Sequence, residues 1–152
     1  MSTIKMLVRG VAAGLLATCV LSVLILIKQW LPQLDTITVM DSIAHEFALS
    51  AGLPTPFAGW LWHFIIGSLV WGWMYAVMEP ILPGRRPMTK GLYYGAMVTL
   101  LVWFAVLPLV GAGMFGLQLS MIQPLVSMAQ SLLFGLLLAV TYDWLSQPRP
   151  GG

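Results

Sequence analysis

The sequence has few charged residues. Only 8% of its 152 residues are Asp, Glu, Lys or Arg, whereas 59% are hydrophobic and the mean hydropathy is +0.91. Soluble domains typically carry about 25% charged residues, so water is not the main solvent of this chain. The formal net charge is only +2, which is too small for a nucleic-acid-binding surface. We expect the lipid bilayer as a partner and no nucleic acid.

The sequence also lacks the residues of common catalytic and metal sites. Its one cysteine, Cys19, excludes an internal disulfide and a cysteine-cluster metal site. There is no phosphate-binding loop, nucleophile motif or zinc-ligand spacing. Glu79 and Asp143 lie beside basic residues at predicted helix ends, where exposed ion pairs are the expected role. We therefore predict that the protein is not an enzyme.

Long apolar runs are what the sequence has instead. A membrane-spanning helix needs about 20 apolar residues, and because its backbone groups bond to one another it suits lipid. Four segments meet this requirement, at about residues 7–29, 57–79, 91–110 and 122–145. The chain is thus predicted to be a single transmembrane domain over residues 1–152, an all-α integral membrane protein with a four-helix bundle.

The first apolar run also resembles a lipoprotein signal, in which a cysteine follows a short apolar segment. Leu16-Ala17-Thr18-Cys19 has this order. However, Thr18 occupies a position where such signals prefer Gly, Ala or Ser, and the apolar run continues through Ile27. We expect a retained membrane helix.

The basic residues predict the orientation. Only Lys28 lies at the far end of the first predicted helix, whereas the other six basic residues lie at the start of that helix, between the second and third, or after the fourth. These six are Lys5, Arg9, Arg85, Arg86, Lys90 and Arg149. Because Lys and Arg concentrate on the cytoplasmic side, a multi-pass protein with cytoplasmic N and C termini is predicted.

The two halves of the chain share a pattern. The segment from Arg9 to Gly14 followed by Thr18 matches, position for position, the segment from Lys90 to Gly95 followed by Thr99. Helices two and four share a shorter Ser-Leu-x-aromatic-Gly pattern. A duplicated hairpin keeps the same orientation in both copies, so we predict two parallel hairpin repeats. The alternative is that the spacing of small residues recurs by chance in apolar sequence.

Small residues recur every four positions in helices one and three. The residues concerned are Gly10, Gly14, Thr18, Gly91, Gly95 and Thr99. Such spacing forms grooves in which another helix backbone approaches closely. One interpretation is packing within the bundle and the other is a homodimer face. We favour packing within the bundle because two matched grooves can fill each other.

An insertion separates helices one and two. Apolar residues of segment 38–51 fall on one helical face and His45 and Glu46 on the other. This pattern predicts an amphipathic helix on the outer side that covers the mouth of the bundle.

His63 is the leading candidate for a polar site, since it is the one ionisable residue well inside a predicted span. The partners expected near it are His45, Glu46 and Gln130. Three functional roles are open: a haem or metal ligand, a proton carrier, or a contact to a substrate. The alternative is a histidine that bonds to a neighbouring carbonyl or water. Because one histidine without a certain second ligand is less than a metal site requires, no metal or cofactor is predicted.

Several motifs carry a family resemblance. They are Arg9-Gly10 with Ala13-Gly14-Leu15 and Thr18, then Trp60, His63 and Gly67, then Gly72, Tyr75 and Met78-Glu79. In these the chain resembles an uncharacterised family of small four-helix bacterial inner-membrane proteins, known as a domain of unknown function. The resemblance implies a bacterial inner (cytoplasmic) membrane location and supplies no activity.

Three functional hypotheses follow. The first is a non-enzymatic packing or accessory component that associates with itself or with a larger membrane complex. The second is a small transporter or channel with a path between the two repeats, lined by His63 and Gln130. The third is a haem- or metal-binding membrane subunit.

Overall fold

The computed structural model describes residues 3–28, 55–109, 111–118 and 120–147. Within these ranges the regular structure is helical and contains no strand. Four helices are long and apolar enough to cross a membrane: Thr3–Leu24, Gly59–Met78, Pro87–Leu109 and Gln123–Ser146. The predicted all-α, four-helix membrane fold is confirmed. The amphipathic helix expected at 38–51, with His45 and Glu46, lies outside the described residues.

Two of the four membrane helices are interrupted by π-helical turns. The first helix is α1 (Thr3–Lys28), and the second comprises α3 (Thr55–Ile65), the π-helix η2 (Ile66–Gly72) and α4 (Trp73–Met78). The third comprises α5 (Pro87–Leu101), the π-helix η3 (Val102–Val106) and α6 (Leu107–Leu109). A short 3₁₀ turn, η4 (Met114–Gly116), precedes the fourth helix, α7 (Gln123–Ser146).

Prolines mark several of these boundaries. Pro87 and Pro124 lie in the first turns of α5 and α7, where a missing N–H costs no helical hydrogen bond. Pro108 instead lies in α6, directly after η3. Because proline cannot donate the bond that an α-helix needs at that position, the wider π turn before it is a local adjustment to Pro108.

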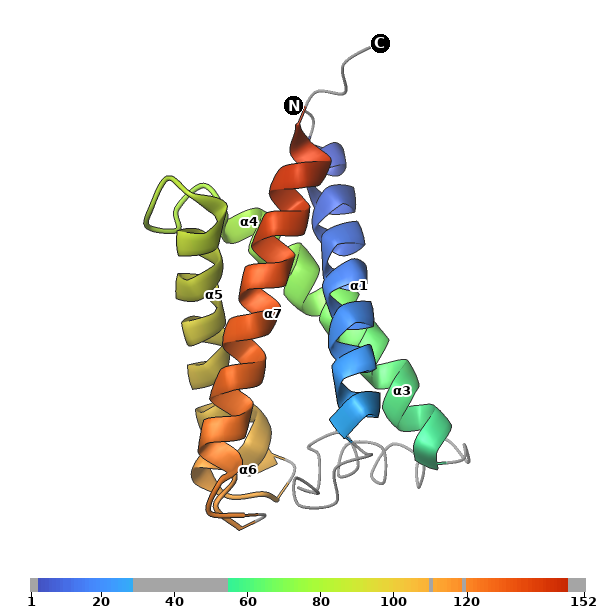
Figure 1. Cartoon of the computed structure of the whole chain (residues 1–152), viewed down its shortest axis with the longest axis vertical. Coiled ribbons are helices and arrows are strands. Elements are labelled where there is room, and N and C mark those ends of the chain that lie inside the picture. Colours follow the sequence, from blue (N-terminus) through green and yellow to red (C-terminus); the bar gives the residue numbers. More distant parts are fainter. Residues whose placement is uncertain (1–2, 29–54, 110, 119, 148–152) are drawn as a thin grey trace.

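The helices form two hairpins that pack side by side (Figure 1). In the first hairpin α1 packs against η2 and α4, and in the second α5 packs against α7. The hairpins meet where α7 packs against α1. The start of α1, the end of α7 and the link between α4 and α5 lie at one end of the bundle (Figure 1). This end therefore carries Lys5, Arg9 and the link at residues 79–86.

Most side chains of the four helices point outward. In the most apolar window of each span only 28% to 39% of residues are buried. The exposed positions are large and apolar, including Leu16, Val23, Leu69, Leu100 and Val140. In a water-soluble protein such a surface would drive aggregation, whereas in a bilayer it is the surface that contacts lipid.

Glycines bring the helix backbones of each hairpin into contact. A Cβ atom added at Gly10 would lie 2.5 Å from the carbonyl oxygen of Gly72, and one added at Gly14 would lie 2.6 Å from that of Gly67. Real Cβ contacts are essentially never under 3.0 Å. The groove of α1 thus faces the partner helix of its own hairpin.

The second hairpin repeats this contact. A Cβ atom at Gly91 would lie 2.6 Å from the carbonyl oxygen of Gly135, and one at Gly95 would lie 2.6 Å from that of Ser131. In addition, Thr99 donates a hydrogen bond to the carbonyl of Gly95 at 2.9 Å, as Thr18 does to that of Gly14 at 2.7 Å. In the described residues both grooves are therefore filled within the chain.

We predict that Gly14→Leu and Gly95→Leu destabilise the protein strongly. Each new side chain would collide with the backbone of the partner helix, an overpacking cost of about 3 kcal/mol. The measurement is the melting temperature in detergent, with Val23→Leu as a control because Val23 is exposed. Similar melting of all three variants would contradict the role of the glycine contacts.

Candidate functional site

His63 bonds to the other helix of its own hairpin. It lies near the end of α3, and its Nε2 atom is 3.1 Å from the Oγ atom of Ser22 on α1. Ser22 is buried and His63 is half-buried. A histidine on one helix is therefore joined to a hydroxyl on the neighbouring helix, inside the first hairpin.

The direction of this hydrogen bond follows from the serine. The hydroxyl of Ser22 donates to the carbonyl oxygen of Thr18 at 2.8 Å, and a hydroxyl has one proton to give. Ser22 Oγ therefore accepts, and His63 Nε2 donates. The same α1 face continues with the Thr18 hydroxyl, which donates to the carbonyl of Gly14. Both hydroxyls of this face thus bond to backbone carbonyls of α1, and the His63 imidazole bonds to Ser22.

Two aromatic rings of the same helix surround His63. The ring centroid of Trp60 lies 5.8 Å from that of His63, and that of Phe64 lies 5.6 Å away, both in edge-to-face orientation. Trp60 and Phe64 also stack at 6.3 Å. These contacts fix the imidazole orientation, so the donor at Nε2 stays aimed at Ser22.

The structure does not bring the other predicted site residues to His63. His45 and Glu46 are outside the described residues. Gln130 is half-buried on α7, and neither it nor His63 bonds to the other within the described part of the chain. Over the same ranges no group of three His, Cys, Asp or Glu residues could hold a metal ion.

A second polar contact joins the helices of the second hairpin. The indole Nε1 of Trp103 donates to Ser127 Oγ at 2.9 Å, and the Ser127 hydroxyl lies 2.9 Å from the carbonyl oxygen of Gln123. The ring of Phe115 packs edge-on against Trp103 at 5.1 Å. Phe115 has a left-handed backbone (φ 60°), which is uncommon for a bulky residue, and its ring contacts hold it in place.

Sequence reasoning missed Trp103 and Ser127, although a signal for them exists. Trp103 lies thirteen residues after Lys90, and Ser22 lies thirteen residues after Arg9. Ser22 on helix one and Trp103 on helix three, which each take part in one of the two polar contacts, therefore occupy matched positions of the repeated pattern. In each hairpin one buried serine hydroxyl receives a ring N–H from the opposite helix.

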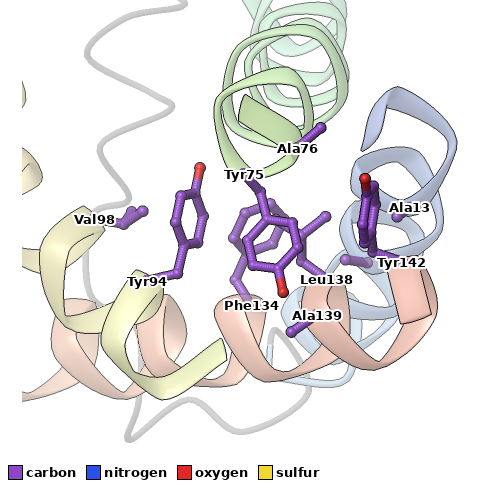
Figure 2. Packing of buried hydrophobic residues seen from close by; sticks show 10 residues of the cluster. Ala13, Tyr75, Ala76, Tyr94, Val98, Phe134, Leu138, Ala139 and Tyr142 are labelled. Atoms are coloured by element: carbon purple, nitrogen blue, oxygen red, sulfur yellow. The ribbon is translucent and has the colours of Figure 1, made fainter. Parts of the chain in front are cut away.

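Three tyrosines fill the space between the hairpins (Figure 2). Tyr75 of α4 packs edge-on against Tyr94 of α5 at 5.1 Å and against Tyr142 of α7 at 5.4 Å. The Tyr94 hydroxyl donates to the carbonyl oxygen of Trp71 at 2.6 Å. Because Trp71 belongs to η2, this bond ties α5 of the second hairpin to the second helix of the first. The cluster was not predicted from the sequence.

An ion pair lies at the end of the bundle where α4 ends and α5 begins. Lys90 Nζ lies 2.5 Å from Glu79 Oε1, and the side chains are 18% and 31% exposed. Lys90 also donates to the carbonyl oxygen of Glu79 at 3.0 Å. The pair is thus less exposed than the surface ion pairs expected for Glu79, and it ties α5 to the end of α4.

A family match covers nearly the whole chain. The sequence model of DUF6789, a family of unknown function, matches residues 4–151. No curated protein and no solved structure matches.

We predict that His63 and Ser22 are energetically coupled. In a double-mutant cycle of His63→Phe and Ser22→Ala, the loss in the double variant should be smaller than the sum of the single losses by about 0.6 kcal/mol, the average for hydrogen bonds between membrane helices, for which about 1.7 kcal/mol is the maximum. The measurement is unfolding in mixed detergent micelles. Additive losses would mean that this contact contributes no stability.

Proposed function

Because the chain belongs to DUF6789, a family of unknown function, we propose its role from the arrangement of its own residues. It is a non-enzymatic accessory component of a membrane complex. The observation that carries this proposal is the filled interface between the two hairpins. A rigid bundle with a packed interior acts through the surface that it presents in the membrane.

The interface is filled by large buried side chains. Tyr75, Tyr94 and Leu138 are each at most 1% exposed, and Phe134 and Tyr142 are each 6% exposed. These residues come from helices two, three and four, and Figure 2 shows their rings and methyl groups facing one another. A transport path between the hairpins needs open space lined by polar or charged groups, whereas these side chains are apolar apart from the tyrosine hydroxyls and are packed together. The packed rings favour an accessory role over a transporter or channel.

The place of His63 supports the same role. Its donor atom is occupied by Ser22 inside the first hairpin, away from the interface between the hairpins. A transporter in which His63 and Gln130 face a shared path requires them to converge, and no hydrogen bond joins them in the described residues. We assign His63 to the stability of the first hairpin.

The two hairpins are repeats of one ancestral unit. The glycine contacts support this proposal, since Gly10 faces Gly72 and Ala76 just as Gly91 faces Gly135 and Ala139. The members of each pair occupy matched positions of the sequence pattern. Unrelated helices would have no reason to place the same contact at the same register.

The bundle resides in the inner (cytoplasmic) membrane of a bacterium, with both termini in the cytoplasm. The end of the bundle at which α1 begins and α7 ends carries Lys5, Arg9 and the Arg85-Arg86 link (Figure 1). Basic residues on one side of a membrane bundle mark the cytoplasmic face. The family resemblance supports the bacterial location.

The accessory role is tested by mass and flux measurements on the same preparation. Extracted from its own membrane in a mild detergent, the protein should run in an assembly of at least twice its own 16.6 kDa. Vesicles that contain it should conduct no more ions than empty vesicles. A monomer whose vesicles show a saturable flux, lost in His63→Ala but kept in Phe64→Ala, would establish the transporter instead.

The orientation is tested with reporter fusions at the two termini and at Gly52. A reporter that is active only outside the cytoplasm should be silent at both termini and active at Gly52, because of the asymmetric basic residues. A fusion active in the cytoplasm should give the reverse pattern. Outside activity at either terminus with silence at Gly52 would invert the assignment.

A further inference from the structure

We propose that the link between helices two and three, residues 79–86, together with the first turn of α5, binds the phosphate group of an anionic phospholipid. The Arg85-Arg86 pair supplies the charge, and neighbouring apolar side chains supply contact with the acyl chains. This proposal is independent of the accessory role above.

The arginines of the link have no acidic partner of their own. Arg85 and Arg86 are exposed and form no ion pair within the described ranges. The link contains one acidic residue, Glu79, and its carboxylate is paired with Lys90. Two guanidinium groups are therefore available to an external anion, and guanidinium binds phosphate oxygens in a bidentate manner.

The link is held in a fixed shape. Lys90 in the first turn of α5 is bonded to the first residue of the link, because its ammonium group donates to both the carboxylate and the carbonyl oxygen of Glu79. Gly84 adopts φ +100° and packs against Thr89, while Pro80 and Pro83 restrict the chain further. A constrained link presents its arginines at little entropic cost on binding.

The beginning of α5 adds to the attraction for an anion. α5 is 15 residues long, begins at Pro87 and has no acidic residue in its first turn. Arg86 at its N-cap has an extended backbone and makes no side-chain capping bond. The positive end of the helix dipole adds to the charge of the arginines and favours a phosphate near them, while the nearby Glu79 carboxylate is neutralised by Lys90.

Apolar side chains beside the arginines identify the occupant as a lipid. Ile81 is 76% exposed and Met88 is 63% exposed, on either side of Arg85 and Arg86. Free phosphate gains nothing from such neighbours. In a membrane they enter the acyl region while the arginines reach the headgroups, the arrangement that basic segments use on anionic leaflets.

The test is lipid binding by native mass spectrometry of the purified full-length protein. The probes are dioleoyl phosphatidylglycerol, dioleoyl phosphatidylcholine and inorganic phosphate alone. We expect preferential binding of phosphatidylglycerol, weakened about fivefold for each arginine removed in Arg85→Gln/Arg86→Gln, since one basic residue near the surface contributes about 1 kcal/mol. The control Lys5→Gln/Lys28→Gln removes the same charge elsewhere and should bind like wild type.

A second pair of substitutions separates lipid from free phosphate. Ile81→Gln/Met88→Gln should weaken phosphatidylglycerol binding while both arginines remain. Melting in phosphatidylcholine alone should be unchanged for all variants, which shows that they fold. Equal phosphatidylglycerol affinity in wild type and Arg85→Gln/Arg86→Gln would overturn the proposal. The proposal would also be overturned if inorganic phosphate displaced the lipid and Ile81→Gln/Met88→Gln left phosphatidylglycerol binding unchanged.

Discussion

Close contact between helix backbones is the constraint on which this bundle depends. In lipid the apolar side chains gain little by leaving their surroundings, so helices associate through packing and hydrogen bonds. At Gly10, Gly14, Gly91 and Gly95 the partner backbone occupies the space where a side chain would be. Serine and threonine hydroxyls beside these glycines bond to their own helix carbonyls, as Thr18 and Thr99 do, so that close approach buries no unsatisfied hydroxyl there.

The hairpins are alike where each packs on itself and different where they meet each other. Tyr94 lies four residues after Lys90, whereas Ala13 lies four residues after Arg9. Both are fully buried in the same core. The large ring of Tyr94 in one hairpin and the small side chain of Ala13 in the other allow the two surfaces to pack closely. Two identical surfaces with large side chains at these positions would not fit together. The tyrosines thus convert two similar hairpins into one packed bundle with a filled interface (Figure 2).

The sequence predicted the helices better than their contacts. Uncharged runs of about 20 residues define spanning helices, and four-residue spacing of glycine and threonine located the faces of close contact. Periodicity gives the face of a helix but not the partner that it meets, so Ser22 was not foreseen as the acceptor for His63. Trp103 and Ser127 were missed for a related reason, since a tryptophan in a membrane helix is equally compatible with the lipid surface. Gln130 was assigned to His63 from its place near the start of helix four, and depth in the membrane says nothing about which direction a side chain faces.

Water accessibility of the interface between the hairpins tests the central claim, that this interface is closed. Leu138 is fully buried there, so a cysteine at this position, introduced into a Cys19→Ala background, should resist a membrane-impermeant maleimide added to either side of intact membrane vesicles. An Arg85→Cys variant provides the positive control, because Arg85 is exposed. Protection of Leu138→Cys at a reagent concentration that labels Arg85→Cys fully is the predicted result. Labelling of Leu138→Cys at a comparable rate would mean that water reaches the space between the hairpins, and it would contradict the closed bundle.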